Sequence, residues 1–309
     1  MNNLRHAADE YLAMRRALGY SMRGQDRLLA SFLDHIDQVG AASITTDLAV
    51  AWATNTRPGT NRAQHNARLT VVRMFATHVH AWDPTTEIPP ADLMPFHYRR
   101  VTPHLFTPQD IDALMRAAGD LKPRLRALTH MTLIGLLATT GMRVGEACGL
   151  DRRDVDCDAG ILTIRAGKLG KAREVPLHPT TSQALRHHDQ QRDQLCPMAS
   201  TAGFFVNTRG RRQAANKVPE VFARLCHAAG VGPAPGGRHP RVHDLRHTFC
   251  VATILDWCRT GVDVHASLPL LSTYLGHVDP AATYWYLQAT PELLALAADR
   301  LDRFLGDLP

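Results

Sequence analysis

The sequence predicts a mainly α-helical protein with a small antiparallel β-sheet, and three observations lead to this prediction. Apolar residues recur at helical spacing through residues 4–82, as in a small helical bundle. Prolines and threonines with little periodicity fill residues 83–104, which is typical of a linker. Two β-type runs, 161–165 and 173–177, flank a glycine-containing turn within an otherwise helical second half.

We therefore expect a helical domain over residues 1–84, a linker over 85–104 and a mixed α/β domain over 105–309. The 309 residues, 45% hydrophobic and 21% charged, suit a globular chain of one large or two ordinary domains. The chain has no run of about 18 apolar residues, and its first residues lack the apolar stretch of a secretory signal. These features predict a cytoplasmic protein without a membrane segment.

The charge balance, the cysteines and the histidines indicate which partners and cofactors the chain could bind. Lys and Arg number 35 against 29 Asp and Glu, and this net charge of +6 favours a polyanionic partner, although the signal is weak alone. The six cysteines form no CxxC pair, so we expect reduced thiols. His239, His243 and His247 recur every four residues, but Pro240 breaks the helix and no carboxylate or cysteine completes a metal site. The residues therefore predict no metal or other cofactor.

The first domain is expected to contain several amphipathic helices. Thr45 or Thr46 can cap a helix that starts at Asp47, and residues 58–60 break the pattern before a basic helix over 61–78. Two interpretations of this basic helix stay open, a surface that faces a DNA backbone and an ordinary solvated face. Its basic residues are Arg62, His65, Arg68 and Arg73.

The second domain begins with a clear helix start at residues 107–110, where a threonine precedes a proline and an aspartate. A very apolar helix over 131–138 is interrupted at 139–141, and a new helix begins near Met142, so Arg143 lies close to a helix start. The hairpin that follows has a basic tip. We further expect a short strand at 204–206 and helices from there to the C-terminus.

Six residues of the second domain suit an attack on a DNA phosphodiester. This reaction needs a nucleophile, cations on the non-bridging oxygens and an acid for the departing 5′ oxygen. Arginines offer forked hydrogen bonds to phosphate oxygens, and a lysine on a hairpin tip can reach the leaving oxygen. Taken singly, each residue is more typical of a surface arginine, a structural histidine or a core tyrosine. The six candidates are Arg143, Lys168, His243, Arg246, His277 and Tyr286.

The order of these residues and their contexts resemble the tyrosine recombinases, also called the phage integrase family. The run 138–150, with Gly141-Met142-Arg143, resembles the first arginine box, and Gly167-Lys168 resembles the lysine of the hairpin. His243-Asp244-Leu245-Arg246 resembles the His-x-x-Arg box. Leu275-Gly276-His277, with Tyr286 nine positions after the histidine, resembles the final box. The resemblance covers about residues 105–287.

The resemblance implies a site-specific recombinase with a helical core-binding (SAM-like) domain and a catalytic domain that close around double-stranded DNA. It implies that Arg143, His243, Arg246 and His277 bind the phosphate and handle protons, and that Lys168 is the general acid. Tyr286 would form a 3′-phosphotyrosyl link and release a 5′ hydroxyl, with no need for ATP or a catalytic metal. Glu146 matches an often acidic position that supports the first arginine box.

Several alternatives stay open. Tyr284 lies two positions before Tyr286, so the choice of nucleophile depends on the spacing from His277. The apolar helix after Thr290 packs on its own domain or docks on a neighbouring subunit of a tetramer on DNA. The residues 284–287 and the long segment 250–274 incline us to a transposon or plasmid element over a chromosome-dimer resolvase. Two rival functions are a type IB topoisomerase and a DNA-binding accessory protein that keeps the fold without catalysis.

Overall fold

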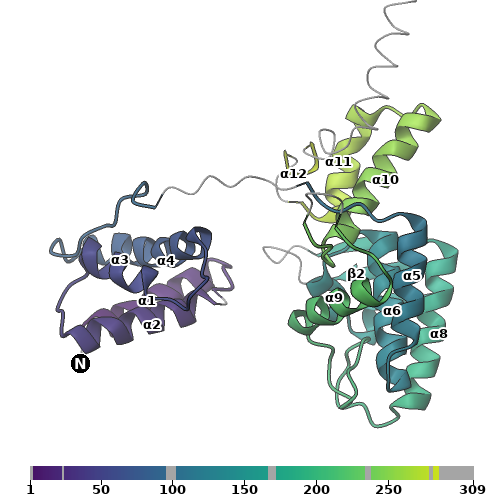
Figure 1. Ribbon diagram of the computed structural model, residues 1–309, viewed down its shortest axis with the longest axis horizontal. Helices are drawn as coiled ribbons and strands as arrows, with labels where there is room; N and C mark the ends of the chain where they lie inside the picture. Colours follow the sequence, from purple (N-terminus) through teal and green to yellow (C-terminus); the bar gives the residue numbers. More distant parts are fainter. Residues whose placement is uncertain are drawn as a thin grey trace, which may run out of the picture. The chain divides into compact units, whose positions relative to one another are not determined.

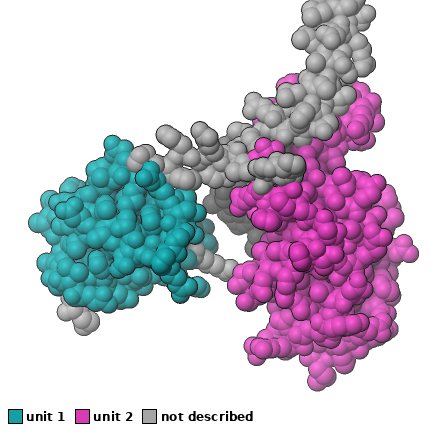
Figure 2. All heavy atoms as spheres, viewed as in Figure 1, with its two compact units in different colours: residues 1–100 teal, residues 101–309 magenta. Residues whose placement is uncertain are grey.

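The computed structural model describes residues 3–22, 24–94, 102–165, 172–233, 238–277 and 281–284. The chain folds into two compact units, Met1–Arg100 and Val101–Pro309, each with its own hydrophobic core (Figures 1 and 2). The described structure is mainly helical, with one small antiparallel sheet in the second unit, as the sequence predicts. None of the described helices is long and apolar enough to cross a membrane.

The first unit is a bundle of four described helices around buried aromatic residues. Phe32 and Phe75 are fully buried, and the ring of Trp52 meets Phe32 edge-on at 5.3 Å between centroids. Thr45 caps the third helix through a hydrogen bond from the backbone N–H of Leu48, which settles the choice between two threonines. The helices are α1 (Asn3–Ala17), α2 (Gln25–Val39), α3 (Thr46–Thr54) and α4 (Arg62–His80).

Three of the four basic residues that the sequence analysis names on α4 have partners within the unit itself, and the first is His65, whose Nε2 lies 2.8 Å from the hydroxyl oxygen of Thr56. Arg68 donates to the backbone carbonyl of Trp52 at 2.7 Å, and its guanidinium lies 3.9 Å from the centre of the Trp52 ring. Arg73 donates to the carbonyls of Pro89 (2.7 Å) and Pro90 (2.8 Å), so the chain is hydrogen-bonded to the first unit as far as Pro90. Of the remaining predicted linker, residues 95–101 lie outside the described residues.

The second unit is organised around α6 (Arg124–Thr140), an apolar helix that contacts α7 (Val144–Gly149), which follows it in the chain, and packs against three further helices (Figure 1). Its residues 133, 134, 136 and 137 are all buried, because neighbours cover several of its faces. The helices that pack on it are α5 (Pro108–Gly119), α8 (Pro179–Leu195) and α10 (Asp244–Thr260). The other described helices are α9 (Val218–Ala228), α11 (Val264–Leu275) and α12 (Ala281–Tyr284), with short 3-10 turns η1 (Arg152–Asp154) and η3 (Ala215–Lys217).

The sheet of the second unit has the strand order β1-β2-β3 and is antiparallel throughout. The predicted hairpin is present, with Ile161 paired to Pro176 and Ile164 to Arg173. The hairpin tip, which includes Lys168, lies outside the described residues. The strands are β1 (Val155–Asp156), β2 (Ile161–Ile164) and β3 (Arg173–Pro176).

One predicted strand is wrong. Residues 204–206 form no strand, and their neighbourhood contains only single bridges, from Gly203 to Asp151 and from Val206 to Arg212. The two phenylalanines at 204 and 205 are buried against the ring of His188. The run is apolar because its side chains pack in the core. A short apolar run has the same sequence pattern whether or not it pairs with another strand, so the sequence could not exclude a strand here. The strand that completes the three-stranded sheet beside the hairpin is β1, which precedes the hairpin in the chain.

Candidate active site

A glycine with a left-handed backbone conformation ends α6 and determines where the first candidate arginine lies. Gly141 has φ 60°, and a Cβ there would lie 2.5 Å from a ring carbon of Phe249, so a glycine suits both the turn and the packing. The chain then turns into α7, for which Arg143 is the N-cap residue. The arginine is therefore fixed at a helix start, as the sequence predicts.

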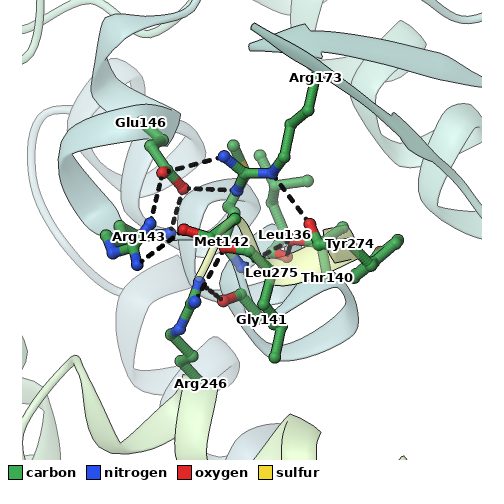
Figure 3. A network of polar contacts seen from close by, with 11 residues as sticks. Leu136, Thr140, Gly141, Met142, Arg143, Glu146, Arg173, Arg246, Tyr274 and Leu275 are labelled. Atoms are coloured by element: carbon green, nitrogen blue, oxygen red, sulfur yellow. Dashed lines mark hydrogen bonds and ion pairs between the residues drawn. The ribbon is translucent and has the colours of Figure 1, made fainter. Parts of the chain in front are cut away.

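The carboxylate of Glu146 joins two arginines (Figure 3). It accepts from the backbone N–H and the Nη1 of Arg143, both at 2.9 Å. It also accepts from Nη1 (3.1 Å) and Nη2 (2.9 Å) of Arg173, a bidentate pair. Burial of Glu146 opposes its ionisation, but the hydrogen bonds and charges of the two arginines outweigh burial and lower its pKa. Glu146 is therefore a buried anion shared by two cations.

Three arginines meet at the C-terminal end of α11 (Figure 3). The backbone carbonyls of residues 274, 275 and 276 accept from Arg173 Nε (2.9 Å), Arg246 Nη2 (2.9 Å) and Arg143 Nη2 (3.2 Å), respectively. The carbonyl of Ser272 accepts from the backbone N–H of His277, and that of Thr273 accepts from the backbone N–H of Gly276. Guanidinium groups thus satisfy the carbonyls that a helix end leaves without a partner, and they face the negative end of the helix dipole.

Arg246 comes from the first turn of α10 and is 2% exposed. Its Nη1 donates to the carbonyl of Gly141 at 2.8 Å, so the same side chain contacts the end of α6 and the end of α11. His243 precedes α10 directly. The His-x-x-Arg spacing therefore places a histidine and a buried arginine on one turn of chain.

His277 follows the left-handed Gly276 that ends α11. Its backbone N–H donates to the carbonyl of Ser272 at 2.9 Å, and its Nδ1 lies 2.7 Å from the hydroxyl oxygen of Thr283 in α12. Burial, followed by the positive charges of Arg246 and Arg143, lowers the pKa of His277 to about 4. The imidazole is therefore neutral at pH 7, which favours a hydrogen-bonding role over that of a permanent cation.

The pKa of His243 is also lowered, by burial and then by Arg246 and Arg241. Its ring meets that of His247 perpendicularly, with 5.0 Å between centroids. Burial lowers the pKa of His247 to about 4. Within the described part of the chain no group of three His, Cys, Asp or Glu residues is arranged to hold a metal ion.

The structure brings together five of the residues singled out from the sequence. Arg143, Arg246 and His277 surround the end of α11, Glu146 pairs with Arg143, and His243 adjoins the turn that carries Arg246. Lys168 and Tyr286 lie outside the described residues.

Two residues of this site escaped the sequence analysis, Arg173 and Thr283. Arg173 begins β3 and alternates with the buried Val175, so an arginine on the inward face of a strand was the available signal. Thr283 is fully buried and contacts His277, but nothing in its local sequence distinguishes it from a core threonine.

The chain is similar to known proteins over most of its length. The model of the phage integrase family matches residues 104–292. The chain is 41% identical over 310 residues to the putative integrase/recombinase y4rB of Sinorhizobium fredii (strain NBRC 101917 / NGR234), with 98% of each chain covered. It is 30% identical over 317 residues to the tyrosine recombinase XerC of Mycobacterium sp. (strain JLS), with 97% of this chain and 98% of that one covered.

The fold also matches a solved structure, the Tn1549 transposon integrase in complex with transposon right end DNA. The TM-score is 0.65 at 17% identity, with 97% of this chain and 98% of that chain covered. At this identity the match concerns the fold. The family match over more than half of the chain and the relatives at 41% and 30% identity show that the chain belongs to the phage integrase family and is a tyrosine recombinase, an enzyme that breaks and rejoins DNA.

Proposed function

We propose that the protein is a site-specific recombinase that cleaves double-stranded DNA through Tyr286 and forms a 3′-phosphotyrosyl intermediate. The observation that supports this most directly is the end of α11, where Arg143 and Arg246 lie beside the neutral His277. These groups can hold the two non-bridging oxygens of a phosphodiester and supply uncharged donors or acceptors next to it.

Charge in this site favours an anionic ligand. Arg143 and Arg173 share one carboxylate, and the side chain of Arg143 is 29% exposed. The arginines also act on both histidines, whose pKa values they lower in addition to the effect of burial. A phosphodiester would enter this positive field and share the donors of Arg143, so its binding is expected to raise the pKa of His277.

The proposed chemistry is a transesterification. The Oη of Tyr286 forms a bond to phosphorus, and the bond from phosphorus to the 5′ oxygen breaks. The tyrosine proton passes to neutral His243, and Lys168 gives a proton to the 5′ oxygen, which leaves as a hydroxyl. One phosphoester replaces another, so the step requires neither ATP nor a metal ion. Attack by a 5′ hydroxyl of a partner strand then reverses these transfers and rejoins the DNA.

We further infer a role in the integration, excision or resolution of a mobile element or plasmid. The similarity to an integrase/recombinase and the shared fold with a transposon integrase support this role. Within the chain we assign residues 1–84 to a core-binding domain, 85–104 to a linker and 105–309 to the catalytic domain, and the first part of the linker, as far as Pro90, is hydrogen-bonded to the first unit. Strand exchange between two duplexes requires four active sites, so we expect a tetramer of this chain on DNA.

The nucleophile can be tested with nicked suicide duplexes, tiled across the inverted repeats that sequencing of the DNA around the gene identifies. Cleavage next to a nick releases a short fragment and traps the protein on DNA. We expect a covalent adduct with the natural chain and with Tyr284→Phe, and none with Tyr286→Phe. Tyr284, in α12, is 42% exposed and is the matched control.

The outcomes separate the rival functions. An adduct that survives Tyr286→Phe and disappears in Tyr284→Phe would reassign the nucleophile. If no repeat gives an adduct while the protein still binds that DNA, the accessory-protein alternative holds. Relaxation of a supercoiled plasmid that lacks the repeats would favour the topoisomerase alternative.

A further inference from the structure

Arg173 makes contacts that no role in the proposed chemistry explains. It lies at the start of β3, and each nitrogen of its guanidinium has a protein partner. Nη1 and Nη2 donate to Glu146, and Nε donates to the carbonyl of Tyr274 (Figure 3). We propose that Arg173 is a positioning residue for DNA cleavage: it fixes Glu146, and through it Arg143, together with the end of α11 that carries His277. This inference rests on the proposed function.

The contacts require an arginine. A carboxylate and a carbonyl are bound at once by three nitrogens in one plane, which a lysine ammonium cannot reproduce. The guanidinium also lies against Gly276, where a Cβ would be 2.6 Å from Nη1 of Arg173. The glycine that ends α11 thus leaves room for the arginine, and the two residues form one close contact.

Arg173 is placed to act through other residues and not on the phosphate. Its side chain is 12% exposed, against 29% for Arg143, and its pairing with Glu146 uses both terminal nitrogens. Without Arg173, Glu146 would keep Arg143 as its one charged partner among the described residues, and the carbonyl of Tyr274 would lose its donor. We expect Arg143 and the end of α11 to shift as a result.

Arg212 offers a matched control, because it makes the same kinds of contact at the other end of α7. Its Nη1 donates to the carbonyls of residues 148, 149 and 150 at 3.3, 2.8 and 2.9 Å, and its Nη2 pairs with Asp151. It is thus a structural arginine that binds helix-end carbonyls and a carboxylate. Loss of Arg212 reports what a purely structural defect does.

A first experiment needs no DNA. Hydrogen exchange is measured by mass spectrometry in the natural chain, Arg173→Lys and Arg212→Lys. We expect Arg173→Lys to speed exchange in peptides that cover the end of α11, with α6 and α8 unchanged, and Arg212→Lys to leave the end of α11 unchanged. Unaltered exchange at the end of α11 in Arg173→Lys would overturn the proposal, and so would faster exchange spread over the whole unit.

A second experiment measures single-turnover cleavage of the nicked duplex at saturating protein. We expect Arg173→Met to slow cleavage by on the order of 100-fold and Arg173→Lys by about tenfold, since small displacements of reacting groups have effects of this size. Arg212→Lys should cleave within about twofold of the natural chain. The affinity for the duplex, measured separately, should stay within about twofold in Arg173→Met, because Arg173 is not expected to touch DNA.

The coupling to Glu146 is the decisive readout. If Arg173 acts through Glu146, Arg173→Met should slow cleavage by a much smaller factor in a Glu146→Gln background than in the natural chain. Equal factors in both backgrounds would overturn the proposal.

A duplex with sulfur in place of the bridging 5′ oxygen needs no acid for its leaving group. Recovery of Arg173→Met on that duplex would place the defect at the leaving group and also overturn it.

Failure of the proposed function would look different. In that case the natural chain itself forms no adduct, whereas the exchange experiment still tests the contacts of Arg173. If the natural chain forms the adduct and Arg173→Met cleaves at the natural rate, the positioning role alone is contradicted.

Discussion

Two arginine clusters of the second unit have opposite charge patterns. Arg152 lies between two carboxylates, those of Asp189 (2.7 Å) and Asp193 (2.9 Å), and its side chain is 43% exposed. Glu146 lies between Arg143 and Arg173 and is 6% exposed. Exposed pairs of the first kind contribute about 0–1 kcal/mol to stability, because water screens them. The second arrangement is buried and rich in cations, which suits the binding of an anion.

The histidines show the difference in charge. Burial lowers the pKa of His188 to about 4, and this residue is fully buried beside two phenylalanines. The pKa of His277 is lowered equally far, to about 4, although its side chain is only partly buried. Arg192 also lowers the pKa of His188, but His277 is surrounded by more positive charge, because Arg246, Arg143 and Arg173 all add to the effect of burial. We therefore expect the two clusters to respond differently to mutation.

The largest expected difference concerns the arginines themselves. Arg246→Lys removes the fork that joins Gly141 and Leu275, and we expect single-turnover DNA cleavage to slow by on the order of 100- to 1000-fold. Arg152→Lys should cleave within about twofold of the natural chain. A similar loss of activity in both variants would show that cleavage depends on general stability and not on the cluster at α11.

The carboxylates should differ in their effect on stability. Glu146→Gln leaves two partly buried guanidinium groups without their shared carboxylate, so we expect the free energy of unfolding to fall by about 3 kcal/mol. Asp189→Asn removes one of the two partners of the exposed Arg152 and should cost about 1 kcal/mol or less. Urea unfolding followed by circular dichroism measures both values, and equal losses would contradict the contrast.

Two glycines that end neighbouring helices sharpen the comparison further. Gly261 and Gly276 both have left-handed backbones, with φ 78° and 67°. A Cβ at Gly261 would meet nothing within 4 Å, so Gly261→Ala should cost on the order of 1 kcal/mol for backbone strain. Gly276→Ala adds a clash with Arg173, and we expect a further loss of about 1–3 kcal/mol in urea unfolding. Equal costs would mean that Arg173 does not pack on this helix end as described.

The smallest expected effect is a pH dependence. The folded-state pKa of His277 lies below its usual value near 6.5, so between about pH 6.5 and 4 the unfolded chain binds a proton that the folded chain does not. Uptake of this proton by the unfolded chain lowers the free energy of unfolding. The contribution of neutral His277 to that free energy is therefore fully present above pH 6.5 and is lost as the pH falls towards 4. His277→Gln should make the melting temperature less sensitive to pH between 7 and 5. An unchanged slope would contradict the lowered pKa.

The fold was predictable where local chemistry determines it. The sequence indicates a helix start at Thr107, where the structure has a capping box formed by Thr107 and Asp110, and Gly141 ends α6 where the apolar pattern breaks. The same local reasoning failed at residues 204–206, since an apolar run does not reveal whether a partner strand exists.

The site was predictable only in part, for a related reason. Arg143, Arg246 and His277 stand in a recognisable order along the chain, so their resemblance to a family is visible in the sequence. The roles of Arg173 and Thr283 depend on contacts between elements far apart in the chain: the sequence separation from Arg173 to Glu146 is 27 residues and that to Tyr274 is 101. No periodicity or spacing encodes such contacts.

The most direct test of the account is to identify the amino acid that becomes attached to DNA. The trapped adduct from the nicked duplex is digested with nuclease and protease, and the modified peptide is sequenced by mass spectrometry. The account predicts a phosphodiester to the 3′ end of the DNA on Tyr286, and its loss in Arg246→Lys at early times. Attachment at Tyr284, or to a 5′ end, would contradict it.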